Sequence, residues 1–222
     1  MIYYIDRVDC IHEQELQDLL PFLSAERREK VSRYRFAKDR VQSILAYLLL
    51  RYGLIKDHGI LSVPQIGKTA QGKPFLQEHP HIHYNLSHCE KAVACGFSSA
   101  PLGVDVQHTV PYKESIAKFF MTPQERMGVV LGNAGEIFTR LWTMKEAYGK
   151  YTGEGICYGM SETPITEGWT SEGCFIKSHL LDGFYLSVCS REEHMLESVS
   201  LAQLRDFFDL TTIPRDIKGE CL

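Results

Sequence analysis

The chain has 222 residues, of which 44% are hydrophobic and 23% are charged. These fractions are typical of a folded globular protein and exclude a disordered or collagen-like chain. The formal net charge at pH 7 is only -4 and no block of like charge runs through the sequence, so neither a nucleic-acid groove nor a membrane-surface patch is expected. This length accommodates one large domain or two smaller halves.

The seven cysteines argue against a disulfide framework, because their number is odd and no CxxC spacing occurs. Free thiols are typical of a reducing compartment. The start "MIYYIDRVDC" lacks the basic segment and long apolar run of a signal peptide, and the run "ILAYLLL" is too short to span a bilayer. We therefore expect a cytoplasmic protein with no membrane partner.

The first half of the chain opens with "IYYI", whose alternation predicts a strand. A long helix is expected over residues 24–53, with Ser24 as its N-cap and Gly53 as its stop. Glycine, proline and lysine between residues 59 and 80 predict irregular structure. Three strands rich in β-branched and aromatic residues are expected next, at 82–87, 91–97 and 102–107.

The second half returns to a helical pattern near Pro111. Helices are expected over residues 114–120, 122–131 and 134–153, the last ended by glycines. Two alternating runs between residues 174 and 190, joined at Asp182-Gly183, predict a β-hairpin. This order predicts an α+β fold with two similar halves, residues 1–108 and 109–222.

The stretch "RLWTMKEAYGK" carries the first candidate residues for chemistry, because Glu146 and Lys150 share one face of a helix. In "GVDVQ", strand alternation directs Asp105 and Gln107 to one face. Mg2+ usually takes only one or two protein carboxylates, so Asp105 with Glu146 would suffice. The alternatives are a surface Glu-Lys pair and an aspartate that bonds a local turn.

Other polar side chains suit phosphate. Ser87 and His88 in "YNLSH" and Lys73 in "GKP" can donate hydrogen bonds to it, and Arg27 and Lys30 share one helical face. A Ser-His hydrolase is disfavoured, since neighbours in an extended segment face opposite sides. The alternatives are a solvated loop lysine, a buried histidine and a wet helix face.

Taken together, "GKP", "YNLSH", "GVDVQ" and "WTMKEAYGK" resemble, in order and approximate spacing, the motifs of the Sfp-like (surfactin-synthetase-activating) 4'-phosphopantetheinyl transferases. The segment "FLSAERREKVSRYRFAKDR" resembles their coenzyme A-binding helix, so the match covers about residues 20–155. The resemblance implies two halves in a pseudo-twofold arrangement, with the active site in the cleft between them. It also implies a monomer, because one chain holds both halves.

The implied reaction moves 4'-phosphopantetheine from coenzyme A to a serine of an apo acyl or peptidyl carrier protein and releases adenosine 3',5'-bisphosphate. By resemblance, Mg2+ is bound by Asp105, Glu146 and Gln107. Glu146 could also deprotonate the acceptor serine, and Lys150 meets the transferred phosphate. The implied coenzyme A-binding residues are Arg27, Lys30, Lys73, Ser87 and His88.

Gln107 departs from the family pattern, because many relatives have an acidic residue there, and an amide oxygen contributes no formal charge. This motivates a rival hypothesis, a coenzyme A- or carrier-binding protein with little or no catalysis. Glu125 lies near a further acidic position of relatives and has no assigned role. A second rival is a transition-metal protein that uses His81 and His83, which share a strand face but have no third ligand.

The carrier is expected to dock by one of its own helices. The apolar residues Phe119, Phe120 and Met121 could form a groove for it, or they could be the core of their own helix.

Overall fold

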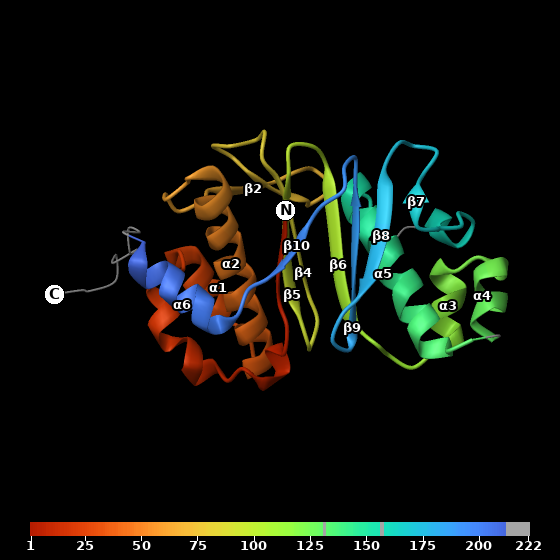
Figure 1. The fold of residues 1–222 in the computed structure, drawn as a ribbon, viewed down its shortest axis with the longest axis horizontal. Coiled ribbons are helices and arrows are strands. Elements are labelled where there is room, and N and C mark those ends of the chain that lie inside the picture. Colours follow the sequence, from red (N-terminus) through yellow and green to blue (C-terminus); the bar gives the residue numbers. More distant parts are fainter. Residues whose placement is uncertain (131, 156–157, 212–222) are drawn as a thin grey trace.

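The computed structural model describes residues 1–130, 132–155 and 158–211 of the chain. Figure 1 shows two α+β lobes side by side, each with one four-stranded sheet and one long helix against it. The long helix is α2 (Ala37–His58) in the first lobe and α5 (Ala134–Thr152) in the second. The predicted α+β fold with two similarly built halves is confirmed.

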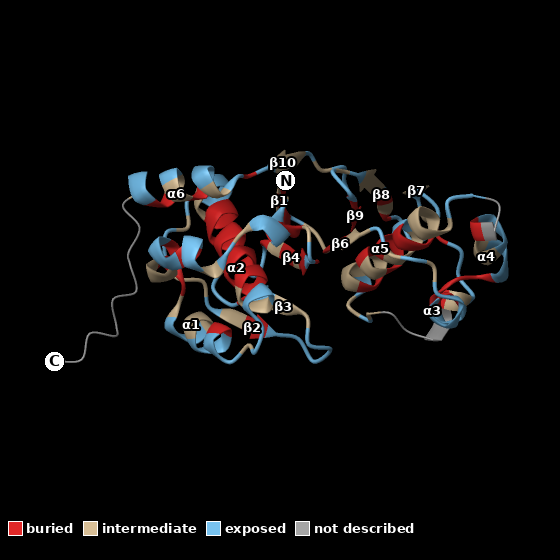
Figure 2. Cartoon of the chain, turned by 90° about the horizontal axis from the view of Figure 1, so that it is seen from below, coloured by how far each residue is buried: buried red, intermediate tan, exposed pale blue. Residues whose placement is uncertain are grey.

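The first sheet has the strand order β10-β1-β5-β4. Its strands are β1 (Ile2–Ile5), β4 (His83–His88), β5 (Val93–Ser98) and β10 (Leu196–Ser198). α2 covers one face of this sheet and is buried along much of its length, as Figure 2 shows. The first lobe also contains the 3-10 helices η1 (Val8–Cys10) and η2 (Glu13–Phe22) and the helix α1 (Ala25–Ser32).

The second sheet has the order β6-β9-β8-β7 and is antiparallel throughout. Its strands are β6 (Leu102–His108), β7 (Gly168–Trp169), β8 (Phe175–Leu180) and β9 (Phe184–Ser190). The predicted hairpin at Asp182-Gly183 is confirmed between β8 and β9. The helices α3 (Glu114–Phe120) and α4 (Pro123–Val130) and the 3-10 helix η3 (Tyr158–Ser161) complete this lobe. The helix predicted over residues 122–131 corresponds to α4, and its predicted last residue, 131, lies outside the described residues.

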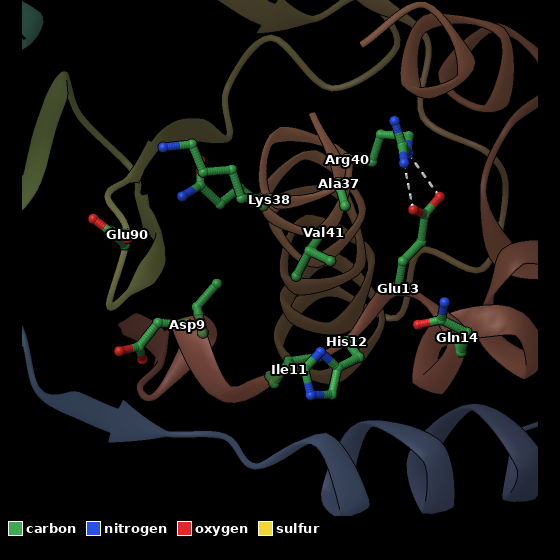
Figure 3. A pocket seen from close by; sticks show the side chains of 12 residues that line it. Asp9, Ile11, His12, Glu13, Gln14, Ala37, Lys38, Arg40, Val41 and Glu90 are labelled. Carbon is green, nitrogen blue, oxygen red and sulfur yellow. Dashed lines mark hydrogen bonds and ion pairs between the residues drawn. The ribbon is translucent and has the colours of Figure 1, made fainter. Parts of the chain in front are cut away.

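The single helix predicted over residues 24–53 was wrong, because the chain turns between α1 and α2. Arg40 stabilises this turn. Its guanidinium binds both carboxylate oxygens of Glu13 at 2.7 and 2.8 Å and donates to the carbonyls of Tyr34 and Arg35. Figure 3 shows the Arg40–Glu13 pair beside a cavity at the start of α2. Ser24 is the N-cap of α1, as predicted, and accepts from the backbone N–H of Arg27.

Gly53 does not stop α2. A Cβ at Gly53 would lie 2.1 Å from the Phe97 ring, so glycine is required there for packing. The helix ends at Gly59, whose φ of 65° permits the left-handed cap.

The segment predicted as irregular contains a short hairpin, β2 (Ile66–Lys68) and β3 (Pro74–Leu76). Its turn is closed by the bond from Thr69 N–H to the Lys73 carbonyl, and Gly72 adopts a φ of 85°.

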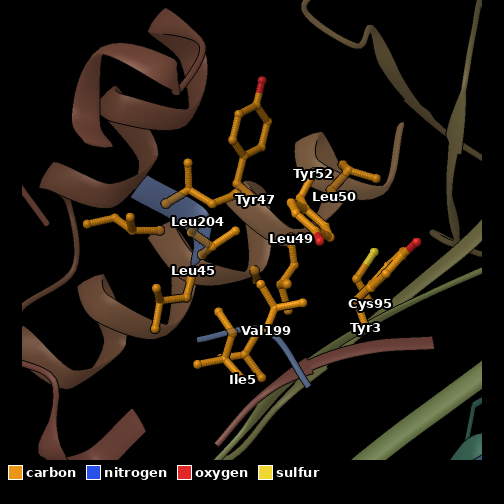
Figure 4. Close-up of a cluster of buried hydrophobic side chains, with 14 of the residues drawn as sticks. Tyr3, Ile5, Leu45, Tyr47, Leu49, Leu50, Tyr52, Cys95, Val199 and Leu204 are labelled. Carbon is orange, nitrogen blue, oxygen red and sulfur yellow. The ribbon is translucent and has the colours of Figure 1, made fainter. Parts of the chain in front are cut away.

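The end of the described chain returns to the first lobe. β10 pairs with β1 in parallel, and α6 (Leu201–Leu210) follows it. Val199 and Leu204 join the buried cluster around Ile5 and Leu45, as Figure 4 shows. β6 belongs to the predicted first half, residues 1–108, but it is hydrogen-bonded into the second sheet. The division of the chain at residue 108 therefore stays a proposal. In that division, β6 is the strand at which the two halves meet.

Five cysteines, at positions 10, 89, 95, 174 and 189, are free thiols, whereas Cys157 and Cys221 lie outside the described residues. Across residues 1–130, 132–155 and 158–211, no helix has the length and apolar character needed to cross a membrane.

Candidate functional site

The site is built on β6, whose alternation buries Val104 and Val106 in the core between the two sheets. Asp105 is only 6% exposed. Its Oδ1 accepts a hydrogen bond from Ser87 Oγ at 2.8 Å and pairs with Lys150 Nζ at 2.7 Å. A buried carboxylate with a cation and a hydroxyl at one oxygen is held in a fixed orientation. Asp105 is therefore a fixed part of the junction between the lobes.

The edge of β6 that faces β4 carries no backbone ladder, and side chains take its place. Asn85 Oδ1 accepts from Val104 N–H at 2.8 Å, and Ser87 Oγ accepts from Val106 N–H at 3.2 Å.

The carbonyls of the same edge are bound by two lysines. Lys73 Nζ donates to the Leu102 carbonyl at 3.2 Å, and Lys150 Nζ donates to the Val104 carbonyl at 3.0 Å. Because buried backbone groups need partners, these four side chains replace the missing strand. We call this arrangement the side-chain edge.

β4 sends its alternate residues to two different places. Asn85 and Ser87 face β6, whereas Tyr84, Leu86 and His88 line a cavity of about 760 Å³ on the first lobe. Ser87 and His88 therefore do not face the same site, although both were predicted to bind coenzyme A. Ser87 belongs to the side-chain edge and His88 to the cavity.

The cavity has a basic rim. Arg27, Lys30, Arg33 and Lys68 line it, together with the acidic residues Glu26 and Asp39. Arg27 and Lys30 thus share one surface, as their spacing predicted. Its volume falls in the range of small-molecule sites, and four cations against two carboxylates favour an anionic occupant.

His88 adds an imidazole to the cavity at the exposed end of β4. Partial desolvation by the surrounding protein lowers the pKa of His88, and the nearby positive charge of Lys150 lowers it further.

Lys73 does not line this cavity. Its ammonium is held by the carbonyls of Leu102, Lys150 and Tyr151, so it joins the β2–β3 hairpin to the C-terminal turn of α5. Burial lowers the pKa of Lys73. A cation at the carbonyl end of a helix is favourable. This position fits a clamp between the lobes, and the contact of Lys73 with coenzyme A stays a prediction.

α5 brings Glu146 and Lys150 against β6. The close approach depends on Gly103, where a Cβ would lie 1.9 Å from the Ala147 carbonyl oxygen. The carboxylate of Glu146 accepts no hydrogen bond from the described part of the chain. Its pKa is raised first by burial and then by the negative charge of Asp105. Glu146 therefore lies close enough to Asp105 and Lys150 to feel the charge of both.

The oxygen set fits a hard divalent cation. Asp105 and Glu146 repel each other, and among the described residues no hydrogen bond reaches Asp105 Oδ2, which leaves an oxygen available. Gln107 lies on the same face of β6 as Asp105, half-buried, and could add a neutral oxygen. Within the described ranges, no group of three or more His, Cys, Asp or Glu side chains could hold a metal ion. His81 and His83 therefore have no third His, Cys, Asp or Glu ligand among the described residues.

Glu125 has a structural partner that the sequence did not suggest. Its Oε2 pairs at 2.9 Å with Nζ of Lys145, which is fully buried and also donates to the carbonyls of Phe120 and Met160. Glu125 Oε1 accepts from Ile165 N–H. The pair holds α4 and the segment after α5 onto α5 itself.

Of the residues predicted to meet a carrier, Phe120 and Met121 are fully buried and pack with Phe138 in the core of the second lobe. Phe119 is 47% exposed, and Ile116 and Met127 are exposed on the same pair of helices. The core interpretation therefore holds for two of the three residues.

Asn85 was missed as a site residue. It lies within the quoted "YNLSH" motif, and its place two residues before Ser87 was the signal, because alternation puts both on one face of β4.

Known proteins match this chain over most of its length. A family model described as "4'-phosphopantetheinyl transferase, N-terminal" matches residues 11–98, and one described as "4'-phosphopantetheinyl transferase superfamily" matches residues 101–204. The chain is 31% identical to 4'-phosphopantetheinyl transferase psf-1 of Bacillus pumilus, over 85% of this chain and 87% of that one. It is 27% identical to 4'-phosphopantetheinyl transferase Sfp of Bacillus subtilis (strain 168), over 91% and 96% of the two chains. The chain therefore belongs to the 4'-phosphopantetheinyl transferase family, as an enzyme of the Sfp-like type.

Proposed function

We propose that this enzyme transfers the 4'-phosphopantetheine group from coenzyme A to a serine of an apo acyl or peptidyl carrier protein, with Mg2+, and releases adenosine 3',5'-bisphosphate. The observation that carries the proposal is the meeting of Asp105, Glu146 and Lys150 at the lobe junction, with His88 between this junction and the basic cavity. Names of relatives support the same transfer.

In this reaction the serine Oγ attacks the β-phosphorus of coenzyme A, and the bond from that phosphorus to the bridging oxygen breaks. The bisphosphate leaves with the bridging oxygen, and the serine proton needs an acceptor. Glu146 suits this role, because its raised pKa makes it a better base than an ordinary carboxylate. Lys150 places positive charge where charge develops on the phosphate oxygens.

The bound cation would be held by Asp105 and Glu146, with Gln107 as a neutral third ligand. When bound, Mg2+ supplies charge neutralisation to the pyrophosphate. Lys150 already pairs with Asp105 in this structure, so the second carboxylate, Glu146, leaves a negative charge that a divalent cation would offset.

In the cavity, Arg27, Lys30 and His88 would hold the phosphates of the nucleotide end of coenzyme A. Lys73 and Ser87 are assigned here to the lobe junction that carries the reacting phosphate, rather than to the cavity.

The carrier protein would dock on α3 and α4, where Ile116, Phe119 and Met127 present apolar surface. We propose that the enzyme acts as a monomer in the cytoplasm, with no nucleic-acid or membrane partner. One chain contains both lobes and all three residues of the junction.

The test is incubation of the purified protein with a panel of apo carriers, coenzyme A and Mg2+, followed by mass spectrometry of each carrier. We expect a mass gain of one phosphopantetheine group that depends on coenzyme A and is lost with a chelator. Binding of coenzyme A without a mass gain on any carrier would support the rival, a binding protein without catalysis. The panel also identifies whether fatty-acid, polyketide or nonribosomal-peptide carriers are preferred.

A further inference from the structure

Tyr47 contributes a ring, and no hydrogen bond, to the floor of the basic cavity. It lines the cavity from α2 and is 1% exposed. Figure 4 shows its hydroxyl pointing away from the aliphatic side chains of the core. That hydroxyl is buried and finds no hydrogen-bond partner among the described residues. A buried hydroxyl without a partner does not stabilise the fold, so the aromatic ring is the part of Tyr47 that contributes here.

The ring supports Arg27. The guanidinium carbon of Arg27 lies 5.0 Å from the centroid of the Tyr47 ring, within the range of a cation–π contact. Arg27 Nη1 lies 3.5 Å from Ser43 Oγ, and its backbone N–H is capped by Ser24, which fixes the start of α1 above α2. In the described part of the chain no carboxylate pairs with Arg27. Its charge is therefore held over the cavity by an aromatic face.

We propose that Tyr47 is the positioning residue for Arg27. Its ring holds the guanidinium over the cavity to receive the 3'-phosphate of coenzyme A, and so sets the preference for coenzyme A over 3'-dephospho-coenzyme A. This inference rests on the proposed function, because it takes coenzyme A as the occupant of the cavity. A guanidinium held in advance loses less conformational freedom when it binds a phosphate.

The experiment measures the dissociation constants of coenzyme A and 3'-dephospho-coenzyme A by calorimetry for a set of variants. Tyr47→Leu removes the ring and should weaken coenzyme A roughly three- to tenfold, a range set by the strength of a cation–π contact, without a matching loss for the dephospho form. Tyr47→Phe keeps the ring and should restore the preference. Tyr47→Leu should add little to the loss caused by Arg27→Ala, because both act on one contact.

Tyr52→Leu is the matched control. Tyr52 is also on α2 and carries the Lys56 ammonium 5.2 Å from its ring, but it is not among the residues that line the cavity. It should change neither dissociation constant selectively. If Tyr47→Leu fails to fold, as a thermal melt would show, Tyr47→Met keeps much of the side-chain volume and gives the same comparison.

Three outcomes would overturn the inference. Equal losses for both ligands in Tyr47→Leu would show that Tyr47 does not act on the 3'-phosphate. A loss in Tyr47→Phe as large as in Tyr47→Leu would assign the contact to the hydroxyl instead of the ring. Failure of the unmodified protein to bind either ligand would remove the proposed function itself, and it would be visible before any variant is measured.

Discussion

The two edges of β6 are completed in different ways. Toward β9 the strand has a continuous antiparallel ladder, from Leu102 opposite Ser190 to His108 opposite Phe184. Toward β4 its backbone groups are bound by side chains from three segments of the chain. A backbone ladder forms with almost any residues, whereas a side-chain edge depends on the identity of each one. The edge that depends on sequence is also the one beside Asp105.

The largest effect is expected where α5 meets the side-chain edge. Glu146→Gln should lower the rate of transfer by at least about a hundredfold, because it removes a base and a charged metal ligand. The fold should stay intact, since the Glu146 carboxylate accepts no hydrogen bond from a described residue. Carrier modification followed by mass spectrometry measures the rate. An active Glu146→Gln protein would remove Glu146 from the site.

The same variant has a pH signature. The pKa of Glu146 is raised in the folded protein above its ordinary value of 4.5, so the folded state holds this proton more tightly than the unfolded state. The free energy of unfolding should therefore fall as pH rises from about 4.5 through the raised pKa. Glu146→Gln should remove this loss and be at least as stable at pH 7. Denaturant unfolding at a series of pH values tests the sign.

Asn85→Leu should break the side-chain edge without touching the cavity. It leaves Val104 N–H buried without an acceptor, which costs about 1–3 kcal/mol of unfolding free energy. Transfer should slow, because Asp105 follows Val104 on β6. Asn85→Asp keeps an acceptor at this position and should retain more stability than Asn85→Leu. Urea unfolding and steady-state rates measure both effects.

Tyr185→Phe is the control on the other edge. Tyr185 lies opposite Gln107 on β9, and its hydroxyl makes no hydrogen bond with a described residue. The backbone ladder is unchanged by this substitution, so stability and rate should stay close to those of the unmodified protein. A loss equal to that of Asn85→Leu would contradict the distinction between the two edges.

Lys73→Met distinguishes two roles of Lys73, holding the two lobes together and binding coenzyme A. If Lys73 holds the lobes together, the variant should lose about 1 kcal/mol, or roughly 2–4 °C in Tm for a chain of this length, even without coenzyme A. Thermal melts with and without coenzyme A make the measurement. Steady-state rates give the KM for coenzyme A. An unchanged Tm together with a raised KM would restore the ligand role that the sequence predicted.

Gln107→Glu should have the smallest effect. The added charge beside Asp105 should lower the Mg2+ concentration needed for half-maximal rate, although repulsion from Asp105 and Glu146 opposes the gain. The preference among carriers should not change. A Mg2+ titration of initial rates at saturating coenzyme A is the measurement. Identical half-saturation in both proteins would place Gln107 outside the reach of the metal.

The sequence predicted most elements of the fold, because their periodicity is local. It failed where a tertiary contact decides the outcome. Gly53 has the composition of a helix stop, but the Phe97 ring packs against it and the helix continues. The turn before α2 depends on Glu13, which lies far from Arg40 in sequence.

The sequence predicted a set of candidate site residues, whereas it did not predict how they are arranged in space. The structure brings together Asp105, Glu146 and Lys150. It places Ser87 and Lys73 on the side-chain edge instead of in the cavity, and no local pattern could show that for Lys73, whose partners are distant backbone carbonyls. For Ser87, strand alternation carried the information.

The return of the chain to the first lobe has a consequence for the order of folding. β1 is made before the second lobe, but its parallel partner β10 and the helix α6 come after the whole second lobe. During synthesis the first lobe therefore waits with one sheet edge unpaired and the apolar surface under Val199 and Phe208 uncovered. The second sheet, by contrast, is finished once β9 has been made. The lobe that starts first is thus the last to close, and a chain stopped before residue 196 would leave its unfinished surface open to aggregation.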